Sequence, residues 1–395
     1  MRILHVTPYF APAFAYGGPP RSIFGLCRAL QQNGVEVRVV STTAGGGHEL
    51  PASTQGFASY EGILVHYAPL AWPRWYFHAS IGPVLDEGLA WCDLCHVHGV
   101  WNVPEWTAVR HAARAGVPYV LSPRGMLEPE ALRRGRLRKQ IAWQLLERQA
   151  LRKAALLHAT SEREADTLRQ LDPGADVAMV PNGVETDLAA GAVPGAFRRR
   201  HGLEAGQPLV VFLGRLHPIK RLDLLAAAFA QVHARQPGAR LIVAGRDEQG
   251  YRRVIEPAFA AGGEAVRWTG DLDASQKWEL LADASVLVCC SDSESFGLSV
   301  AEAMAAAVPV VVTRTCPWPD LEQWGCGRWV AQTPGAMADA LLDLLEEPAR
   351  ARRMGALGQA VARRLFSWNV IADAMIAAYD RVLSGGRTRR PSLAS

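Results

Sequence analysis

The sequence predicts an α/β protein made of two doubly wound parallel sheets. Its 395 residues are enough for about two domains of roughly 150 residues each. Hydrophobic residues make up 49% and charged residues 20%, which allows large buried cores and excludes disordered and collagen-like classes. Short β-branched runs alternate with longer helical patterns, and the runs are apolar throughout. This alternation indicates βαβ units, and unbroken apolar strands indicate sheets that helices cover on both faces.

Two series of predicted strands divide the chain. The first series lies at residues 3–6, 35–40, 63–66, 94–97, 119–121, 156–158 and 177–180. The second series lies at residues 209–213, 241–244, 265–268, 286–289 and 308–312. The polar stretch 181–208 between the two series contains Gly and Pro, as domain boundaries often do. We therefore expect an N-terminal domain over residues 1–190 and a C-terminal domain over residues 191–366, with a ligand in the cleft between them.

Two helical patterns follow the second series, at residues 336–347 and 367–383. In the second pattern, Trp368, Ile371, Met375 and Tyr379 are spaced to share one buried face. The last residues, 385–395, are rich in Arg, Ser and Gly, and we expect a disordered tail there.

Composition limits the partners and the compartment. The 42 basic and 38 acidic residues give a net charge of +4, which does not indicate nucleic-acid binding. Only four of the 42 basic residues are Lys, at positions 139, 153, 220 and 277. Seven scattered Cys do not form the framework of a secreted disulfide protein. The first residues show no signal peptide and no apolar run reaches the ~18 residues of a membrane helix, so we expect a soluble cytoplasmic protein.

Candidate phosphate contacts occur in both halves of the chain. Gly17 and Gly18 precede a predicted helix, where backbone N–H groups could approach an anion, although taken alone this pair is better explained by ordinary turn chemistry. Neither a G-x-G-x-x-G fingerprint nor a Walker-type loop is present, which argues against dehydrogenases and P-loop enzymes. Gly214 ends a predicted strand, and Arg215 and Lys220 follow it. Two cations at a strand end suit a diphosphate, and an anion between them would offset their unfavourable position at a helix N-terminus.

The most informative segment is 290–305, which has the pattern of a strand end, a loop and a helix. Glu294 lies in the loop, and Glu302 lies in the second turn of a helix that begins near residues 296–298. The N–H groups at this helix start form an anion site. Glu294 would lie beside whatever carries the anion, while Glu302 could accept two hydrogen bonds from a vicinal diol such as a ribose. Two unrelated surface acids would explain each Glu but not their spacing.

This segment resembles the signature of retaining nucleotide-sugar glycosyltransferases of family 4, which have the GT-B fold of two Rossmann-like domains. The resemblance rests on the EX7E motif that Glu294 and Glu302 form, with Glu-Ser-Phe-Gly-Leu, Glu-Ala-Met-Ala and Pro309-Val310-Val311 around it. Three other landmarks occur in the family's order: Gly17-Gly18-Pro19, Pro181-Asn182-Gly183-Val184 and Gly214-Arg215-Leu216-x3-Lys220. The resemblance covers residues 1 to about 384, and implies that the helix at 367–384 returns to the N-terminal, acceptor-binding domain.

The resemblance also implies roles for the matched residues. Glu294 would contact hydroxyls of the donor sugar, Glu302 the ribose, and Arg215 and Lys220 the diphosphate, with the base near Leu272. The donor-binding set it implies is Gly17, Gly18, Asn182, Gly214, Arg215, Lys220, Leu272, Glu294, Ser295, Phe296, Gly297, Leu298 and Glu302. Glu294, Arg215 and Lys220 would also take part in catalysis. No metal and no cofactor would be needed, because cations and peptide dipoles stabilise the leaving diphosphate.

Two motifs of the N-terminal half, His96-Val97-His98-Gly99-Val100-Trp101 and Ser122-Pro123-Arg124-Gly125-Met126-Leu127, resemble the subset that builds bacterial surface polysaccharides. The position in the second motif that is commonly His is Arg124 here. A guanidinium cannot shuttle protons near neutral pH, so we assign Arg124 an electrostatic role on the donor phosphate or the acceptor. His98 is a second catalytic candidate, and a purely structural role for it is equally open.

The pattern Cys92-x-x-Cys95-His96-x-His98 contains the residue types of a zinc site. Successive side chains of one strand point to opposite faces, so these four cannot converge on one ion. We therefore expect buried thiols and no metal.

Residues 133–153 carry eight basic residues and one acid, Glu147, with Leu137, Ile141, Trp143 and Leu145 among them. Either the apolar stripe of this helix packs on the first sheet, or the helix lies on anionic lipid, and the two roles are compatible. We keep both, with a peripheral position on the inner face of the cytoplasmic membrane as the consequence of the second.

The sequence therefore predicts a metal-independent, retaining hexosyltransferase. It would move a sugar from a UDP- or GDP-sugar to a hydroxyl of a glycan or lipid-linked acceptor, in the synthesis of exopolysaccharide, O-antigen or a related glycoconjugate. Alternatives are a GT-B sugar phosphorylase, a sugar-nucleotide epimerase, or a catalytically silent membrane-associated binding protein. The presence of Glu294, Glu302, Arg215 and Lys220 argues against the silent protein.

Overall fold

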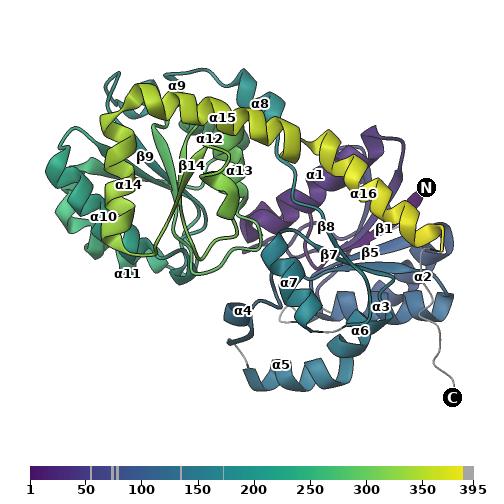
Figure 1. The fold of residues 1–395 in the computed structure, drawn as a ribbon. Helices are drawn as coiled ribbons and strands as arrows, with labels where there is room; N and C mark the ends of the chain where they lie inside the picture. Colours follow the sequence, from purple (N-terminus) through teal and green to yellow (C-terminus); the bar gives the residue numbers. More distant parts are fainter. Residues whose placement is uncertain (54–55, 73–74, 77–79, 134–135, 172, 386–395) are drawn as a thin grey trace, which may run out of the picture. The chain divides into compact units, whose positions relative to one another are not determined.

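The computed structural model describes the chain except for residues 54–55, 73–74, 77–79, 134–135, 172 and 386–395 (Figure 1). The chain divides into two compact units. Unit 1 consists of Met1–Asn182 and Trp368–Ser395, and unit 2 consists of Gly183–Ser367. The first division falls inside the stretch 181–208 where a boundary is expected. Of the expected tail, residues 386–395 lie outside the described residues.

Unit 1 contains an eight-stranded sheet in the order β3-β4-β2-β1-β5-β6-β7-β8. All neighbouring strands are parallel except β3, which is antiparallel to β4. The strands are β1 (Arg2–Val6), β2 (Glu36–Thr42), β3 (Ala58–Tyr60), β4 (Ile63–Ala68), β5 (Leu94–His98), β6 (Tyr119–Ser122), β7 (Leu156–Ala159) and β8 (Val177–Met179). The predicted first series is therefore confirmed. The edge strand β3 was not predicted, because its three residues are exposed or half-buried and carry no apolar run.

Helices cover both faces of this sheet (Figure 1). They are η1 (Phe14–Tyr16), α1 (Gly18–Gln32), α2 (Ile81–Trp91), α3 (Val103–Ala115), α4 (Pro129–Arg133), α5 (Arg136–Ala142), the π-helical segment η3 (Trp143–Glu147), α6 (Arg148–Lys153), α7 (Glu162–Gln170) and α16 (Trp368–Leu383). The last helix, α16, packs along α1, so closely that a Cβ added at Gly25 would lie 2.0 Å from the Trp368 ring. Ile371, Met375 and Tyr379 are buried, which confirms the predicted apolar face.

The basic segment 133–153 differs from the expectation that its apolar stripe packs on the sheet. The side chains of Ile141 and Leu145 are 62% and 68% exposed, and Trp143 is only partly buried. The side that faces the core instead carries Glu147, Ala150 and Leu151. A π-helical turn at Trp143–Glu147 rotates the helix within the segment, which a regular helical spacing does not anticipate. Leu137 belongs to the side chains that the structure does not describe.

Unit 2 contains a six-stranded parallel sheet in the order β11-β10-β9-β12-β13-β14. The strands are β9 (Leu209–Leu213), β10 (Arg240–Ala244), β11 (Val266–Gly270), β12 (Val286–Cys289), β13 (Val310–Thr313) and β14 (Gly327–Val330). Alternate residues of the central strands enter different cores, with Val211 and Leu287 in one and Val210 and Val288 in the other. This explains the unbroken apolar runs. The edge strand β14 was not predicted, since only Gly327 of its four residues is buried.

The helices of unit 2 lie on both faces of its sheet (Figure 1). They are α8 (Thr186–Gly191), α9 (Ala196–His201), η4 (Pro218–Lys220), α10 (Leu222–Arg235), α11 (Tyr251–Ile255), η5 (Glu256–Ala265), α12 (Ala274–Asp283), α13 (Leu298–Ala305), η6 (Pro319–Leu321), α14 (Pro334–Glu346) and α15 (Pro348–Phe366). In the described part of the chain, none of the helices of either unit combines the length and apolar character needed to cross a bilayer.

Candidate functional site

In unit 2 the direction of strand addition reverses between β9 and β12, which are neighbours although β10 and β11 separate them in sequence. Such a switch point leaves room outside the carboxyl ends of the strands, where ligands of doubly wound sheets bind. Gly214 follows β9, and a Cβ at Gly245 would lie 1.9 Å from the Gly214 carbonyl oxygen. Only glycine at position 245, with φ of +145°, allows these two loops to approach so closely.

The loop between β12 and α13 is held by its neighbours. Thr315 Oγ1 donates a hydrogen bond to the Ser291 carbonyl at 2.6 Å, and the Trp318 indole donates to the Phe296 carbonyl at 2.6 Å. The Phe296 ring is buried against Trp318. Gly297, with φ of 88°, turns the chain into α13. The buried Phe296 ring therefore anchors this loop. At residue 296, only the backbone is available to a ligand.

Lys220 and Glu294 meet at this switch point, although 74 residues separate them. Lys220 Nζ lies 2.5 Å from Glu294 Oε1, and Ser291 Oγ donates to the same oxygen at 2.6 Å. Burial lowers the pKa of Lys220, but the Glu294 carboxylate outweighs it and leaves the pKa above its usual value. The ammonium is therefore charged at neutral pH, and a carboxylate balances its charge.

Glu302 forms a second ion pair that the sequence analysis missed. Lys277 Nζ, on α12, lies 2.5 Å from Glu302 Oε1, on α13. The two side chains are only 15% and 14% exposed. The signal that could have singled out Lys277 is composition, since it is one of four lysines among 42 basic residues.

Arg215 lies near enough to Lys220 for its positive charge to oppose the rise in the pKa of Lys220 that Glu294 causes. Arg215 Nη1 lies 2.5 Å from Glu248 Oε2, and its side chain is 37% exposed. Each cation expected to hold a diphosphate thus has a carboxylate beside it in this structure.

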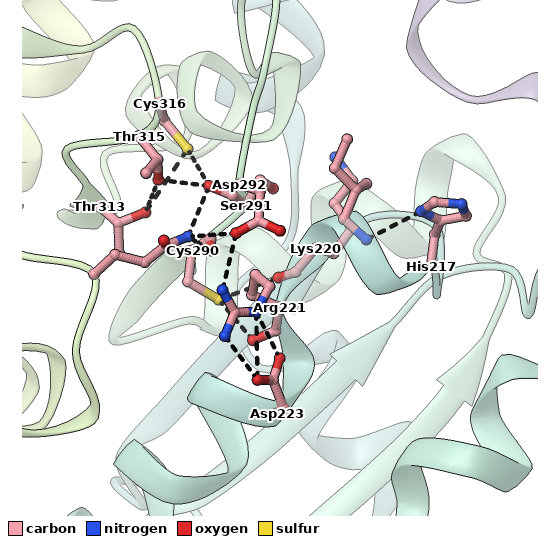
Figure 2. Close-up of polar contacts among 12 residues, drawn as sticks. His217, Lys220, Arg221, Asp223, Cys290, Ser291, Asp292, Thr313, Thr315 and Cys316 are labelled. Atoms are coloured by element: carbon pink, nitrogen blue, oxygen red, sulfur yellow. Dashed lines mark hydrogen bonds and ion pairs between the residues drawn. The ribbon is translucent and has the colours of Figure 1, made fainter. Parts of the chain in front are cut away.

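Arg221, which follows Lys220, links the loop after β9 to the loop after β12 (Figure 2). Its guanidinium donates to Asp223 and, at 2.9 Å, to Asp292 Oδ1. Hydrogen bonds from Asp223 and then Asp292 raise the pKa of Arg221. Gln332 Nε2 donates to the same Asp292 oxygen at 3.2 Å. These contacts of Arg221 and Asp292 could not be predicted from the sequence, because the partners come from separate segments.

Unit 1 has its own switch point, between β1 and β5. His5 Nδ1 lies 2.8 Å from His98 Nε2 across these strands. Arg124, which follows β6 with φ of 57°, points Nη2 at His98 Nδ1 at 3.0 Å and donates from Nη1 to Asn182 Oδ1 at 2.7 Å. Three of the predicted site residues, His98, Arg124 and Asn182, therefore lie together, and His5 joins them.

A row of buried polar groups continues from this point across one face of the sheet. His96 contacts the Tyr379 hydroxyl and Ser122 Oγ, each at 2.6 Å, and Ser122 Oγ lies 2.6 Å from His158 Nδ1. Burial, with a smaller contribution from Arg124, lowers the pKa of His5 to about 3. The same causes lower the pKa of His158 to about 3. Burial also lowers the pKa values of His96 and His98 well below the usual value. The whole row is therefore uncharged at neutral pH.

Arg124 is the charged member of this group. It is 8% exposed, and burial lowers its pKa to about 10, which still leaves it protonated at neutral pH. The hydrogen-bond partners described for its guanidinium, Asn182 and His98, are both neutral. A buried cation without a carboxylate in hydrogen-bond contact is costly unless an anion approaches it.

Within the residues that the structure describes, His5, His96 and His98 offer ligand atoms within 4.8 Å of one another. Both ring nitrogens of His96 and of His98 already have hydrogen-bond partners, and the Arg124 cation is one of them. These contacts fit a hydrogen-bonded row better than a metal site. Cys92 and Cys95 are buried in the core of the opposite sheet face, as expected for packed thiols.

The remaining predicted residues lie in separate places. Gly17, with φ of 88°, precedes α1 in unit 1, and Gly18 is the first residue of that helix. Leu272 follows β11 in unit 2 and is partly buried against its core. Ser295 and Leu298 lie on either side of the turn into α13.

Two family models match the chain. The model described as "Glycosyl transferase 4-like domain" matches residues 17–183, and "Glycosyl transferases group 1" matches residues 195–361. D-inositol 3-phosphate glycosyltransferase of Streptomyces griseus is 32% identical over 362 residues, which cover 84% of this chain and 75% of that protein. The chain is a glycosyltransferase of the family that these two models describe.

This glycosyltransferase also resembles a D-inositol 3-phosphate glycosyltransferase of Segniliparus rotundus, with 32% identity over 58% of the chain. The match spans about half of that relative, 52% of its length. Sucrose-phosphate synthase of Thermosynechococcus elongatus has a similar structure, with a TM-score of 0.76, 21% identity and coverage of 97% and 99% of the two chains. Anabaena HepE in complex with UDP-glucose gives a TM-score of 0.74 at 19% identity, with coverage of 96% and 99%. The predicted GT-B fold, two parallel-sheet α/β domains, is thereby confirmed.

Proposed function

We propose that this glycosyltransferase moves a sugar from a nucleotide-diphosphate donor to an acceptor hydroxyl. The observation that carries the proposal is the Lys220–Glu294 contact of 2.5 Å at the switch point of unit 2, with Glu302 on the helix that follows. In this proposal Glu294 binds hydroxyls of the donor sugar, Glu302 binds the ribose, and Lys220 and Arg215 bind the diphosphate. Gly214, Leu272 and the backbone of 295–298 complete the donor contacts.

The proposed chemistry breaks the bond between the anomeric carbon and the diphosphate oxygen, so negative charge grows on the leaving diphosphate. Lys220 and Arg215 stabilise that charge, which makes a metal unnecessary. Phosphate oxygens would replace Glu294 as the partner of Lys220, and the released carboxylate would accept hydrogen bonds from the sugar. The acceptor hydroxyl then attacks from the face that the diphosphate leaves and gives its proton to the departing diphosphate oxygen, so that the anomeric configuration is retained.

The donor we propose is a UDP- or GDP-sugar, supported by the fold shared with HepE, which was crystallised with UDP-glucose. A thermal-shift panel of UDP, GDP, ADP and their sugars tests this. A nucleotide at about 100 times its Kd stabilises the folded protein by about 2.7 kcal/mol. We expect the uridine or the guanosine series to raise the thermal midpoint of the protein. If none of the nucleotides raises the midpoint, the proposal is overturned.

For the acceptor we propose a glycan or a lipid-linked sugar of surface-polysaccharide synthesis, with an anionic group near Arg124. The support is the buried Arg124 cation with its two neutral partners. The names of several relatives include a phosphorylated compound. One of these relatives is a phosphatidyl-myo-inositol mannosyltransferase of Mycobacterium tuberculosis, which is 31% identical over 222 residues. Gly17 and Gly18 would add backbone contacts to the donor phosphates.

A peripheral contact with the cytoplasmic membrane is part of this proposal. Ile141, Leu145 and Leu146 are exposed on the segment whose surface also carries Arg148 and Arg152. The acid of this segment, Glu147, is buried, with Oε1 accepting from the Trp101 backbone and the Trp106 indole, so it does not reduce the positive charge outside. Apolar side chains among cations suit anionic lipid.

Co-sedimentation with vesicles that contain anionic lipid tests the membrane contact. We expect the protein to bind these vesicles and not vesicles of neutral lipid. The double variant Ile141→Glu with Leu145→Glu should no longer bind. Equal sedimentation of the double variant and the unchanged protein would remove the membrane from the proposal.

Product analysis separates the rival functions. A phosphorylase releases sugar phosphate when phosphate replaces the acceptor, an epimerase converts the donor alone, and a silent binding protein does neither. We expect nucleoside diphosphate release that depends on acceptor and continues in EDTA. Loss of activity in EDTA would contradict the metal-independent mechanism.

A further inference from the structure

Lysine is rare in this chain, and half of its lysines lie in the proposed donor site. Of 42 basic residues only four are Lys, and two of these, Lys220 and Lys277, each contact one glutamate of the EX7E motif at 2.5 Å. Composition alone would place Arg at such positions. The lysine ammonium is compact and carries three donors, whereas the guanidinium of arginine is planar and larger. The ammonium therefore suits a narrow position beside a carboxylate.

Lys277 is held in place by the helix that carries it. Asp273 caps α12 through a hydrogen bond from the Gln276 backbone, and the Gln276 side chain completes a capping box. Lys277 Nζ also lies 4.7 Å from the centre of the Trp278 ring. The Lys277–Glu302 pair is thus a largely buried contact between two ordered helices, with side chains 15% and 14% exposed.

A vicinal diol requires more than a carboxylate can supply. Each hydroxyl donates one hydrogen bond and also accepts, whereas an ionised carboxylate only accepts and an ammonium only donates. The Lys277–Glu302 pair places both functions side by side. We propose that Lys277, together with Glu302, recognises the ribose diol of the donor nucleotide, and that Lys277 determines specificity for ribose over deoxyribose. This inference rests on the proposed function, because it assigns the nucleotide to the EX7E segment.

Calorimetric titration with UDP and 2′-deoxy-UDP, and with GDP and 2′-deoxy-GDP, tests the inference. For the base that binds, we expect the unchanged protein to prefer the ribonucleotide by roughly tenfold, the scale of a hydrogen bond to a charged group. Lys277→Met should bring this ratio close to one by weakening the ribonucleotide. Lys277→Arg, which keeps a charged donor, should restore part of the ratio.

Arg200→Met is the matched control, since Arg200, whose side chain is 50% exposed, binds Glu279 of the same helix at 2.8 Å. It removes an ion pair of α12 and should leave the ribose preference unchanged. If Lys277→Met does not fold, Lys277→Met combined with Glu302→Gln removes both charges, and it should show the same loss of preference.

The outcomes separate this inference from the function on which it rests. A tenfold preference that persists in Lys277→Met, or in the double variant, overturns the role of Lys277. Equal binding of ribo- and deoxyribonucleotides by the unchanged protein overturns ribose recognition while the nucleotide donor stands. Binding of neither nucleotide series by the unchanged protein contradicts the proposed function itself.

Discussion

The switch points of the two sheets solve the problem of buried polar groups in opposite ways. At the switch point of unit 2, Lys220 pairs with Glu294, and Lys277 pairs with Glu302 nearby. At the switch point of unit 1, neutral histidines form a row, and Arg124 contacts only neutral partners among its described hydrogen bonds. In unit 2 each lysine is in direct contact with a carboxylate, whereas in unit 1 Arg124 has no carboxylate among its described hydrogen-bond partners and the nearby Glu164 raises its pKa only through its charge.

This difference teaches how each region can treat a charged ligand. A paired lysine can exchange its carboxylate for a phosphate, so binding replaces one charge contact with another. A buried arginine with neutral partners has no such exchange to make, and an incoming anion relieves its desolvation directly. Four predictions test this difference and are given in order of decreasing effect.

Lys220→Ala should lower turnover about 100-fold or more, since it removes a cation from the growing charge on the diphosphate. The effect on kcat should exceed the effect on donor binding. Steady-state kinetics with varied donor concentration measure both, with Arg200→Ala as the control that should leave them unchanged. Equal losses in kcat and binding would make Lys220 a ground-state ligand only.

Lys220→Ala and Arg124→Gln should differ in stability. The first leaves the Glu294 carboxylate without its cation, which costs about 3 kcal/mol for a pair with little exposure. The second removes a charge that lacks a carboxylate partner, so the thermal midpoint should stay or rise while turnover falls roughly tenfold. Differential scanning calorimetry measures both midpoints. A drop for Arg124→Gln as large as that for Lys220→Ala would show that the two regions are balanced alike.

Glu302→Ala should weaken binding of the free nucleoside diphosphate roughly tenfold, since a hydrogen bond from the ribose to a charged group is lost. Isothermal titration calorimetry measures the change, and Glu279→Ala on α12 serves as its control. Unchanged affinity would remove Glu302 from the donor contacts.

The buried, neutral His5 should make the free energy of unfolding fall as the pH falls from 6.5 toward 3. Burial lowers the pKa of His5 from 6.5 to about 3, so the unfolded chain binds the proton more readily. Its contribution to stability is complete above pH 6.5 and is lost as the pH falls toward 3. The stability difference between the unchanged protein and His5→Asn should therefore narrow by about 1.4 kcal/mol per pH unit in this window. Thermal midpoints that keep a constant difference would contradict a neutral buried His5.

Much of the fold could be predicted, because each central strand is an apolar run between helical patterns. The missed strands, Ala58–Tyr60 and Gly327–Val330, lie at sheet edges, where burial imposes little pattern. The prediction for 133–153 was wrong about which side chains face the core, since a π-helical turn shifts the register there.

The candidate site could be predicted where its residues follow strand ends. Glu294, Arg215 and Lys220 could be singled out because each follows the end of a predicted strand near the start of a helix. The scarcity of lysine marks Lys277 as unusual but could not place it beside Glu302, because that contact joins two separate helices. The spacing of its helix predicts that Tyr379 is buried, but not the contact of its hydroxyl with His96, which lies 283 residues away in the sequence.

The two parallel sheets, the strand ends that carry polar residues and the spacing of the EX7E segment could all be predicted from the sequence, because each depends on local periodicity and turn chemistry. The folded arrangement sets which charges are in direct contact, because it brings Lys277 to Glu302 and gives Arg124 the neutral hydrogen-bond partners Asn182 and His98. The physical reason is that the energy of a charge depends on its distance to other charges and to water. Those distances join segments far apart in the chain.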